Sequence, residues 1–137
     1  MASADQIRAQ IEEGRAALRA ALDSADAARW EAAAGDEEWS ARRVAEHAIG
    51  SERAIAGGVA NAMMGKPPER PELALSSPAE ALAALEAAVA DCNKVIRYVE
   101  DRDLEKRVGE SSTIQASMEL LATHARDHAG QITAATS

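Results

Sequence analysis

Apolar residues recur at helical spacing in four separate stretches of the chain, with charged residues between them. A period of about 3.6 residues is typical of helices that bury one face. The predicted inward positions, helix by helix, are Ile7, Ile11, Gly14, Leu18 and Leu22; Val44, His47, Ala48, Ser51 and Ile55; Leu82, Leu85, Val89, Cys92, Ile96 and Val99; and Ile114, Met118, Leu121, Ala125, His128 and Ile132.

Each stretch begins beside a hydroxyl side chain that can cap free backbone N–H groups. In three of them a Gln or Glu follows three residues later, which is the pattern of a capping box. At the remaining start, Trp39 and Val44 have the spacing of a hydrophobic staple around Ser40. The helices are expected from Ser3 to about Leu22, from Ser40 to about Met64, from Ser77 to about Val99 and from Ser112 to about Thr133.

The segments between the helices differ in kind. Residues 65–76 contain Pro67, Pro68 and Pro71 and cannot remain helical, so they predict one long crossing loop between the second and third helices. Residues 25–34 predict a looser helical connection that ends at Gly35. The connection before the last helix is rich in charge.

The composition favours helices over strands. The chain is rich in Ala and has no Phe, one Tyr and two Trp, so aromatic residues that favour strands are scarce. Its 137 residues suffice for one domain that buries about two-thirds of its unfolded surface. We therefore predict an all-α fold, a four-helix bundle formed by a single domain over residues 1–137.

The net charge of −8 would repel phosphate backbones and anionic lipids, so neither nucleic acid nor a membrane is an expected partner. No apolar stretch reaches the ~20 residues that cross a bilayer, and residues 1–5 lack the pattern of a secretory signal. A soluble cytoplasmic protein is expected. Cys92 has no partner for an internal disulfide and is expected to pack in the core.

All three histidines of the chain fall on or beside inward faces. His124 and His128 are one turn apart on the last helix, and His47 lies on the second helix, so the three rings can converge inside the bundle. Three imidazoles suit one metal ion and leave its other positions open, whereas a closed structural zinc site would need a fourth protein ligand. The alternative is that each His is a core residue with one hydrogen bond.

Small residues follow His47 at helical offsets, namely Gly50, Ser51, Ala54 and Gly58. A Gly inside a helix costs about 1 kcal/mol relative to Ala, so an advantage should offset it. One explanation is a pocket kept clear for a substrate beside the metal, and the other is close packing between helices. Near the histidine faces, Ser51, Ser117, Asp127 and Gln131 could orient ligands or substrate, although Asp127 could also be a solvated surface residue.

Two segments match a known pattern. Residues 38–47, in which Trp39 leads into the helix with the first His, resemble the second helix of the DinB-like superfamily, which includes YfiT-like and mycothiol-dependent maleylpyruvate isomerase-like proteins. Residues 124–132, with two His four apart followed by Gly130 and Gln131, resemble the closing helix of that family. The resemblance implies a DinB-like bundle with His47, His124 and His128 as metal ligands.

The resemblance also implies a divalent ion, zinc or nickel with iron as a further candidate, and a low-molecular-weight thiol as cosubstrate, namely bacillithiol, mycothiol or glutathione. Family members often have a second His where Asp127 stands and an Arg where Ala129 stands, which affects substrate handling and not the ligand set.

The resemblance thus implies a metal-dependent thiol S-transferase or thiol-dependent isomerase, in which a thiol activated by the metal attacks a small electrophilic substrate. The alternative function is a non-catalytic bundle that binds a metal, a small ligand or a protein partner. A homodimer is also a candidate, with Trp30, Met63 or Met64 at its interface.

Overall fold

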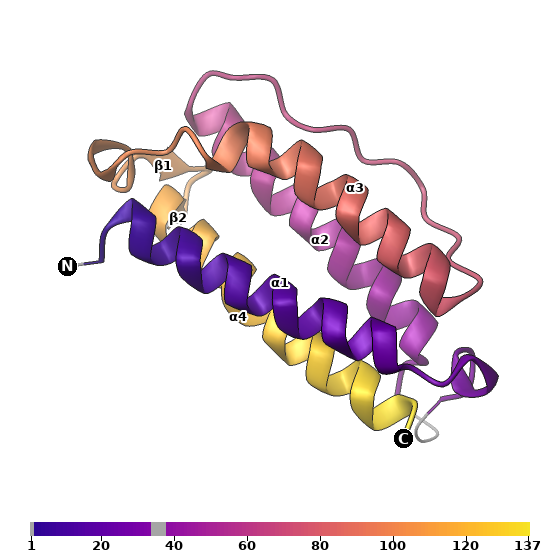
Figure 1. Cartoon of the computed structure of the whole chain (residues 1–137). Coiled ribbons are helices and arrows are strands. Elements are labelled where there is room, and N and C mark those ends of the chain that lie inside the picture. The colour runs from indigo at the N-terminus through magenta and orange to yellow at the C-terminus, as the bar shows by residue number, and fades with distance from the viewer. Residues whose placement is uncertain (1, 34–37) are drawn as a thin grey trace.

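Four long helices run side by side in the computed structural model, which describes residues 2–33 and 38–137. They are α1 (Ala4–Ser24), α2 (Ala41–Ala62), α3 (Pro78–Ile96) and α4 (Ile114–Ala135). Helix α1 lies along α4, and α2 lies along α3 (Figure 1). Helix α4 also packs on α2, so it contacts a neighbour on each side. The predicted all-α four-helix bundle is confirmed.

Local capping explains where the helices begin. The Ser3 hydroxyl accepts from the backbone N–H of Gln6, whose side chain returns to the Ser3 N–H, as a capping box requires. Ser40 and Ser77 cap α2 and α3 through their hydroxyls. The capping box predicted at Ser77 does not form, because the Glu80 carboxylate accepts from the N–H of Ser76 instead. The prediction for the last helix was wrong by one residue, because Thr113 is its cap and Ser112 lies in a strand.

Short elements fill the connections. A single 3₁₀ turn spans Ala27–Arg29, and a second spans Asp101–Asp103. The connection before α4 holds two short antiparallel strands that the sequence did not predict, β1 (Arg107–Val108) and β2 (Ser112–Thr113). The predicted end of the first connection at Gly35 lies outside the described residues.

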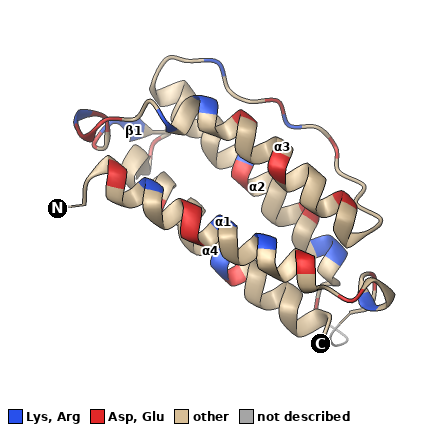
Figure 2. Ribbon diagram, viewed as in Figure 1, with Lys and Arg blue, Asp and Glu red and all other residues tan. Residues whose placement is uncertain are grey.

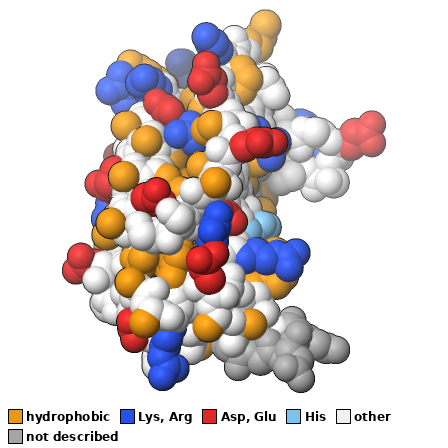
Figure 3. Space-filling model, turned by 90° about the vertical axis from the view of Figure 1, so that its right-hand side faces the viewer, with side chains coloured by type: hydrophobic (Ala, Val, Ile, Leu, Met, Phe, Trp, Pro, Cys, Tyr) orange, Lys and Arg blue, Asp and Glu red, His pale blue; other side chains and the backbone are white. Residues whose placement is uncertain are grey.

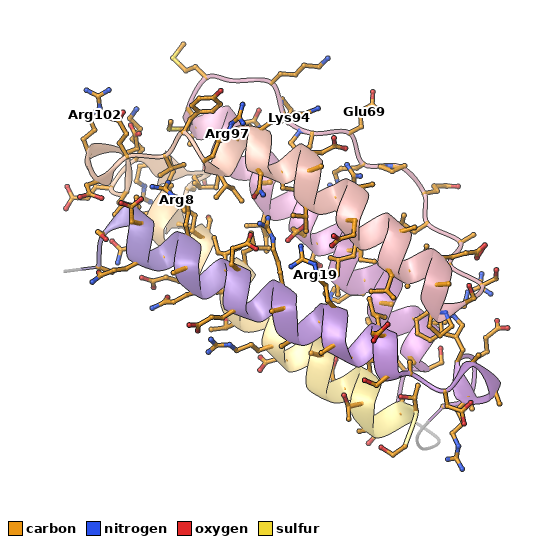
Figure 4. The ribbon with its side chains drawn as sticks, viewed as in Figure 1. Arg8, Arg19, Glu69, Lys94, Arg97 and Arg102 are labelled. Atoms are coloured by element: carbon orange, nitrogen blue, oxygen red, sulfur yellow. The ribbon has the colours of Figure 1, made fainter. Side chains whose placement is uncertain are left out.

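The long loop between α2 and α3 is present as predicted and is fastened to the bundle at several points. The indole N–H of Trp30 donates to the carbonyl of Leu75 over 2.8 Å, and the Leu75 N–H donates to the Glu46 carboxylate over 2.9 Å. Arg53 donates to the carbonyl of Glu69 over 3.1 Å, at the position labelled in Figure 4. The loop is therefore held along its length without secondary structure of its own.

The predicted inward faces form the core. Most of these residues are buried, and Cys92 is fully buried as expected. The prediction was wrong for His47, which lies at the margin of the bundle and is exposed. Burial raises the pKa of the Cys92 thiol to about 12, so this thiol is not a nucleophile near neutral pH. Charged residues are spread along the helices and their connections (Figure 2). The described charged residues that are buried are Arg15, Glu52, Arg53 and Asp103.

Trp30 is only 1% exposed and packs in the core, so it cannot lie at the interface of a dimer as the sequence suggested. Met64, by contrast, is 96% exposed and has a positive φ of 59° just after α2. No helix in the described part of the chain combines the length and the apolar character that crossing a bilayer requires.

Candidate metal centre

The structure brings the three histidines together. His47 lies on α2, and His124 and His128 lie one turn apart on the face of α4 that packs toward α2. One ring nitrogen from each residue can be chosen so that all three nitrogens lie within 4.8 Å of one another. The ring centroids of His128 are 4.9 Å from those of both other histidines, and His47 and His124 are 6.1 Å apart.

The hydrogen bonds of His128 indicate which nitrogen is free. Its Nδ1 lies 2.8 Å from the Gln131 side-chain oxygen, which can only accept, so Nδ1 carries the hydrogen. The lone pair is then on Nε2, which is buried and has no hydrogen-bond partner. Buried ring nitrogens normally have a partner, so the lone pair of His128 Nε2 fits a ligand that the three rings would share.

The surroundings of His47 also favour its neutral form. Loss of water around the ring lowers the pKa of His47 below its ordinary value, and the neighbouring His128 and His124 lower it further. Neutral imidazole is the form that binds a metal, because a protonated nitrogen has no lone pair to donate. His47 is therefore held in the form that can bind a cation.

A pocket of about 720 Å³ opens beside the histidines. Trp39 forms part of its wall, with its ring edge-on to His47 at 5.3 Å between centroids. The Arg43 guanidinium lies 4.3 Å from the centre of the Trp39 ring. Figure 3 shows a histidine side chain at the surface of the molecule. The lining residues are Glu38, Trp39, Val44, His47, Asp127, His128, Gly130, Gln131 and Ala134.

Of the predicted pocket residues, Asp127 and Gln131 line this pocket. Ser51 instead lines a small internal cavity beside His124. Gly50, Ala54, Gly58 and Ser117 line neither of these spaces.

Gly58 packs against the β1 strand, where an added Cβ would lie 3.0 Å from a methyl of Val108. Close packing therefore accounts for this glycine. An added Cβ at Gly50 would meet nothing within 4 Å. The small residues of α2 thus do not form one continuous wall above the histidines.

The sequence missed most of the pocket's wall. Trp39 was expected to pack as a staple, yet it is 40% exposed and faces His47. Gly130 and Ala134 continue the same face of α4, at spacings of three and seven from Asp127. That spacing is a signal that could have identified them.

Comparison with protein families gives one match. The sequence model of the DinB superfamily matches residues 10–132, a span that includes all three histidines and all four helices in whole or in large part. Searches of the curated proteins and of the solved structures found no match.

Proposed function

Since this chain belongs to the DinB superfamily and gathers its histidines beside an open pocket, we propose that it is a metal-dependent enzyme of low-molecular-weight thiols. His47, His124 and His128 bind one divalent ion, zinc or nickel, with iron as a further candidate. The reaction is transfer of the thiol to a small electrophilic molecule, or a thiol-dependent isomerisation. The observation that carries the proposal is the convergence of three imidazoles from two helices, with His47 and His128 in the wall of the pocket.

The ligand set supports a catalytic ion over a structural one. Among the described residues, no Cys, Asp or Glu joins the three histidines as a further member of the group. Structural zinc sites are closed by four protein ligands, whereas catalytic sites keep a position for substrate or water. The pocket lies on the side of His47 and His128, so a small molecule can reach the open positions from there.

The chemistry divides between the ion and the side chains. A divalent ion held by His47, His124 and His128 would supply Lewis acidity, which would lower the pKa of a bound thiol toward neutral pH. Gln131 holds the ring of His128 in one orientation and one tautomer. Trp39 and Val44 give the pocket an apolar wall, and Asp127 can accept a hydrogen bond from a bound thiol or substrate.

The transfer balances without a redox partner. The thiol loses its proton to solvent, its sulfur forms a bond to an electrophilic carbon, and the leaving group departs with the electron pair. In the isomerisation, the sulfur adds to a conjugated carbon and leaves again after rotation about the bond that has become single, so the thiol is regenerated.

The test is elemental analysis of the purified protein together with a thiol-transfer assay. Mycothiol, bacillithiol and glutathione are each offered with a generic haloaromatic electrophile. The wild type should carry about one metal ion per chain and transfer a thiol, and His47→Ala and His124→Ala should lose both properties. Thr123→Ala is the matched control, because Thr123 is the exposed neighbour of His124 and bonds only to backbone carbonyls of its own helix.

The two other outcomes are separable. Equal metal content in the wild type and both histidine variants would contradict the ligand assignment. Metal lost with the histidines but no transfer by any thiol would favour the alternative, a non-catalytic bundle that binds a metal, a small ligand or a protein partner.

A further inference from the structure

The two histidines of α4 differ in how their second ring nitrogen is held. His128 Nδ1 has Gln131 as its partner, whereas the buried His124 Nδ1 has no partner among the described residues. A metal-binding histidine almost always donates its other N–H to a carboxylate, a carbonyl or a water, since this fixes the ring and its tautomer. A metal-binding His124 would therefore need an acceptor close to its Nδ1.

A small cavity lies beside His124, between α4 and the other helices. Its volume is about 10 Å³, which is close to the space that one water molecule needs. Three of its lining side chains are polar, namely Ser51, Glu52 and His124. The complete lining is Leu18, Ala48, Ser51, Glu52, Ile55, Leu85, Leu121, His124 and Ala125.

Glu52 supplies the unsatisfied acceptor. Its side chain is almost fully buried, and Oε1 accepts from Arg15 Nε over 2.6 Å. The second oxygen, Oε2, is buried and has no hydrogen-bond partner. Burial raises the pKa of this carboxyl above its ordinary value, and the contact with Arg15 opposes the rise. One cavity is thus lined by two side chains, each of which has one buried polar atom without a partner.

We propose that a single buried water molecule occupies this cavity and links His124 Nδ1 to Glu52 Oε2, which makes Glu52 a positioning residue for His124. The water accepts from the imidazole N–H and donates to the carboxylate, and the Ser51 hydroxyl is its third partner. With its hydrogen on Nδ1, His124 has its lone pair on Nε2 and can offer it to the metal, as His128 does. The functional consequence rests on the proposed metal site, but the water and the tautomer do not.

The proposal also gives a reason for the ion pair inside the bundle. Replacing a buried ion pair with apolar residues is often neutral or stabilising, so the pair formed by Arg15 and Glu52 is not explained by stability alone. Arg15 donates further to Glu12 and Asn93, which fixes its guanidinium. In this arrangement Arg15 holds Glu52 in place, and Glu52 orients His124 through the water.

The first test uses the wild-type protein, free of metal and labelled with ¹⁵N in its histidines. Long-range proton–nitrogen spectra near neutral pH should show His124 with its hydrogen on Nδ1. A high-resolution crystal structure should show one water within hydrogen-bond distance of both atoms. A hydrogen on Nε2 of His124, or a cavity without that water, would overturn the proposal whether or not any variant folds.

The second test measures zinc affinity. Glu52→Gln keeps the shape of the side chain but removes its charge. Ala48→Val fills the cavity and leaves Arg15 and Glu52 unchanged. Each should lower zinc affinity by about tenfold. The controls are Asp103→Asn, a buried carboxylate outside the cavity, and Ala62→Val, a partly buried alanine of the same helix, and both should bind zinc as the wild type does.

The outcomes separate this inference from the proposed function. If the wild type binds zinc and the folded variants bind it equally well, Glu52 is not a positioning residue and the metal site stands. If the wild type binds no zinc, the proposed metal site is wrong. The tautomer of His124 and the presence of the water then still show whether His124 Nδ1 is linked to Glu52 Oε2.

Discussion

Helix α4 has two interfaces of opposite character. Toward α1 it is so close that a Cβ on Gly14 would lie 2.6 Å from the carbonyl oxygen of Ala122 and 3.2 Å from Ala125. Toward α2 it carries His124 and His128, with a pocket on one side of them and a small cavity on the other. One helix is therefore anchored through small residues on one face and bears the candidate chemistry on the other.

The difference shows how the site keeps its geometry. Backbone contact at Gly14 fixes the distance between α1 and α4 with almost no freedom, because protein interiors resist small changes of volume. The interface between α4 and α2 needs space for the imidazole rings, their ligands and their hydrogen-bond partners. Because this looser packing does not by itself stop the rings from turning, hydrogen bonds must hold them. Acid and three substitutions can each perturb one of these two sides of the bundle, and their expected effects decrease in that order.

Acid should have the largest effect, and it acts on the α2 side. A protonated imidazole cannot bind a metal, and the pKa of His47 lies below its ordinary value, so its ring stays neutral to a lower pH than a free histidine. Metal should therefore stay bound at neutral pH and be lost below about pH 6, with affinity falling about 100-fold between pH 7 and pH 5. A colorimetric chelator can follow the release. Affinity that does not change across this range would contradict histidine ligation.

Gly14→Ala tests the α1 side. The new methyl group would press on a backbone carbonyl that cannot turn away, so α1 and α4 must separate. We expect the free energy of unfolding to fall by about 2 kcal/mol, as for other overpacked cores. Urea denaturation measures this change. An unchanged midpoint would mean that the two helices separate at no cost and that Gly14 does not set their distance.

Gln131→Leu returns to the histidine side with a smaller effect. The variant keeps the approximate size of the side chain but removes the acceptor for His128 Nδ1. Zinc affinity should fall by about tenfold, as is usual when the outer partner of a ligating histidine is lost. Gln115→Leu is the matched control, because Gln115 is on the same helix and bonds to Glu119, away from the histidines. Equal losses in both variants would point to the helix as a whole and not to His128.

Gly50→Ala should have the smallest effect and the opposite sign. A Cβ at this position meets nothing within 4 Å, and Gly inside a helix is less stable than Ala. The free energy of unfolding should rise by about 0.5–1 kcal/mol, with zinc affinity unchanged. Urea denaturation and a zinc titration measure the two quantities. Weaker zinc binding or lost turnover would restore the hypothesis that Gly50 is kept clear for a ligand.

The fold was predictable because its signals are local. Ser3, Ser40 and Ser77 each cap a helix through contacts within the next three residues, so a short window of sequence contains the cause. The hairpin of β1 and β2 gave no such signal, since two-residue strands are too short for a periodic pattern. It depends instead on contacts across the connection, such as the Ile114 N–H donating to the Lys106 carbonyl over 2.9 Å.

The candidate site was predictable only in part. The meeting of His47 with His124 and His128 follows from helical spacing on the sides of α2 and α4 that face each other, although His47 itself is exposed. The side on which the pocket opens does not, because it depends on what covers each face of α2, and Val108 covers Gly58. The ion pair of Arg15 and Glu52 was also missed, since nothing in the local sequence distinguishes a buried charge from a solvated one.

The two tryptophans sit in contrasting surroundings. Trp30 is enclosed by the core, with its N–H on the Leu75 carbonyl, and Trp39 stands at the pocket edge-on to His47. The chain has no other tryptophan and only one tyrosine, so its ultraviolet emission comes almost entirely from these two rings. One fluorophore therefore reports unfolding and the other reports occupancy of the site, and Trp39→Phe separates the two optical signals without any added label.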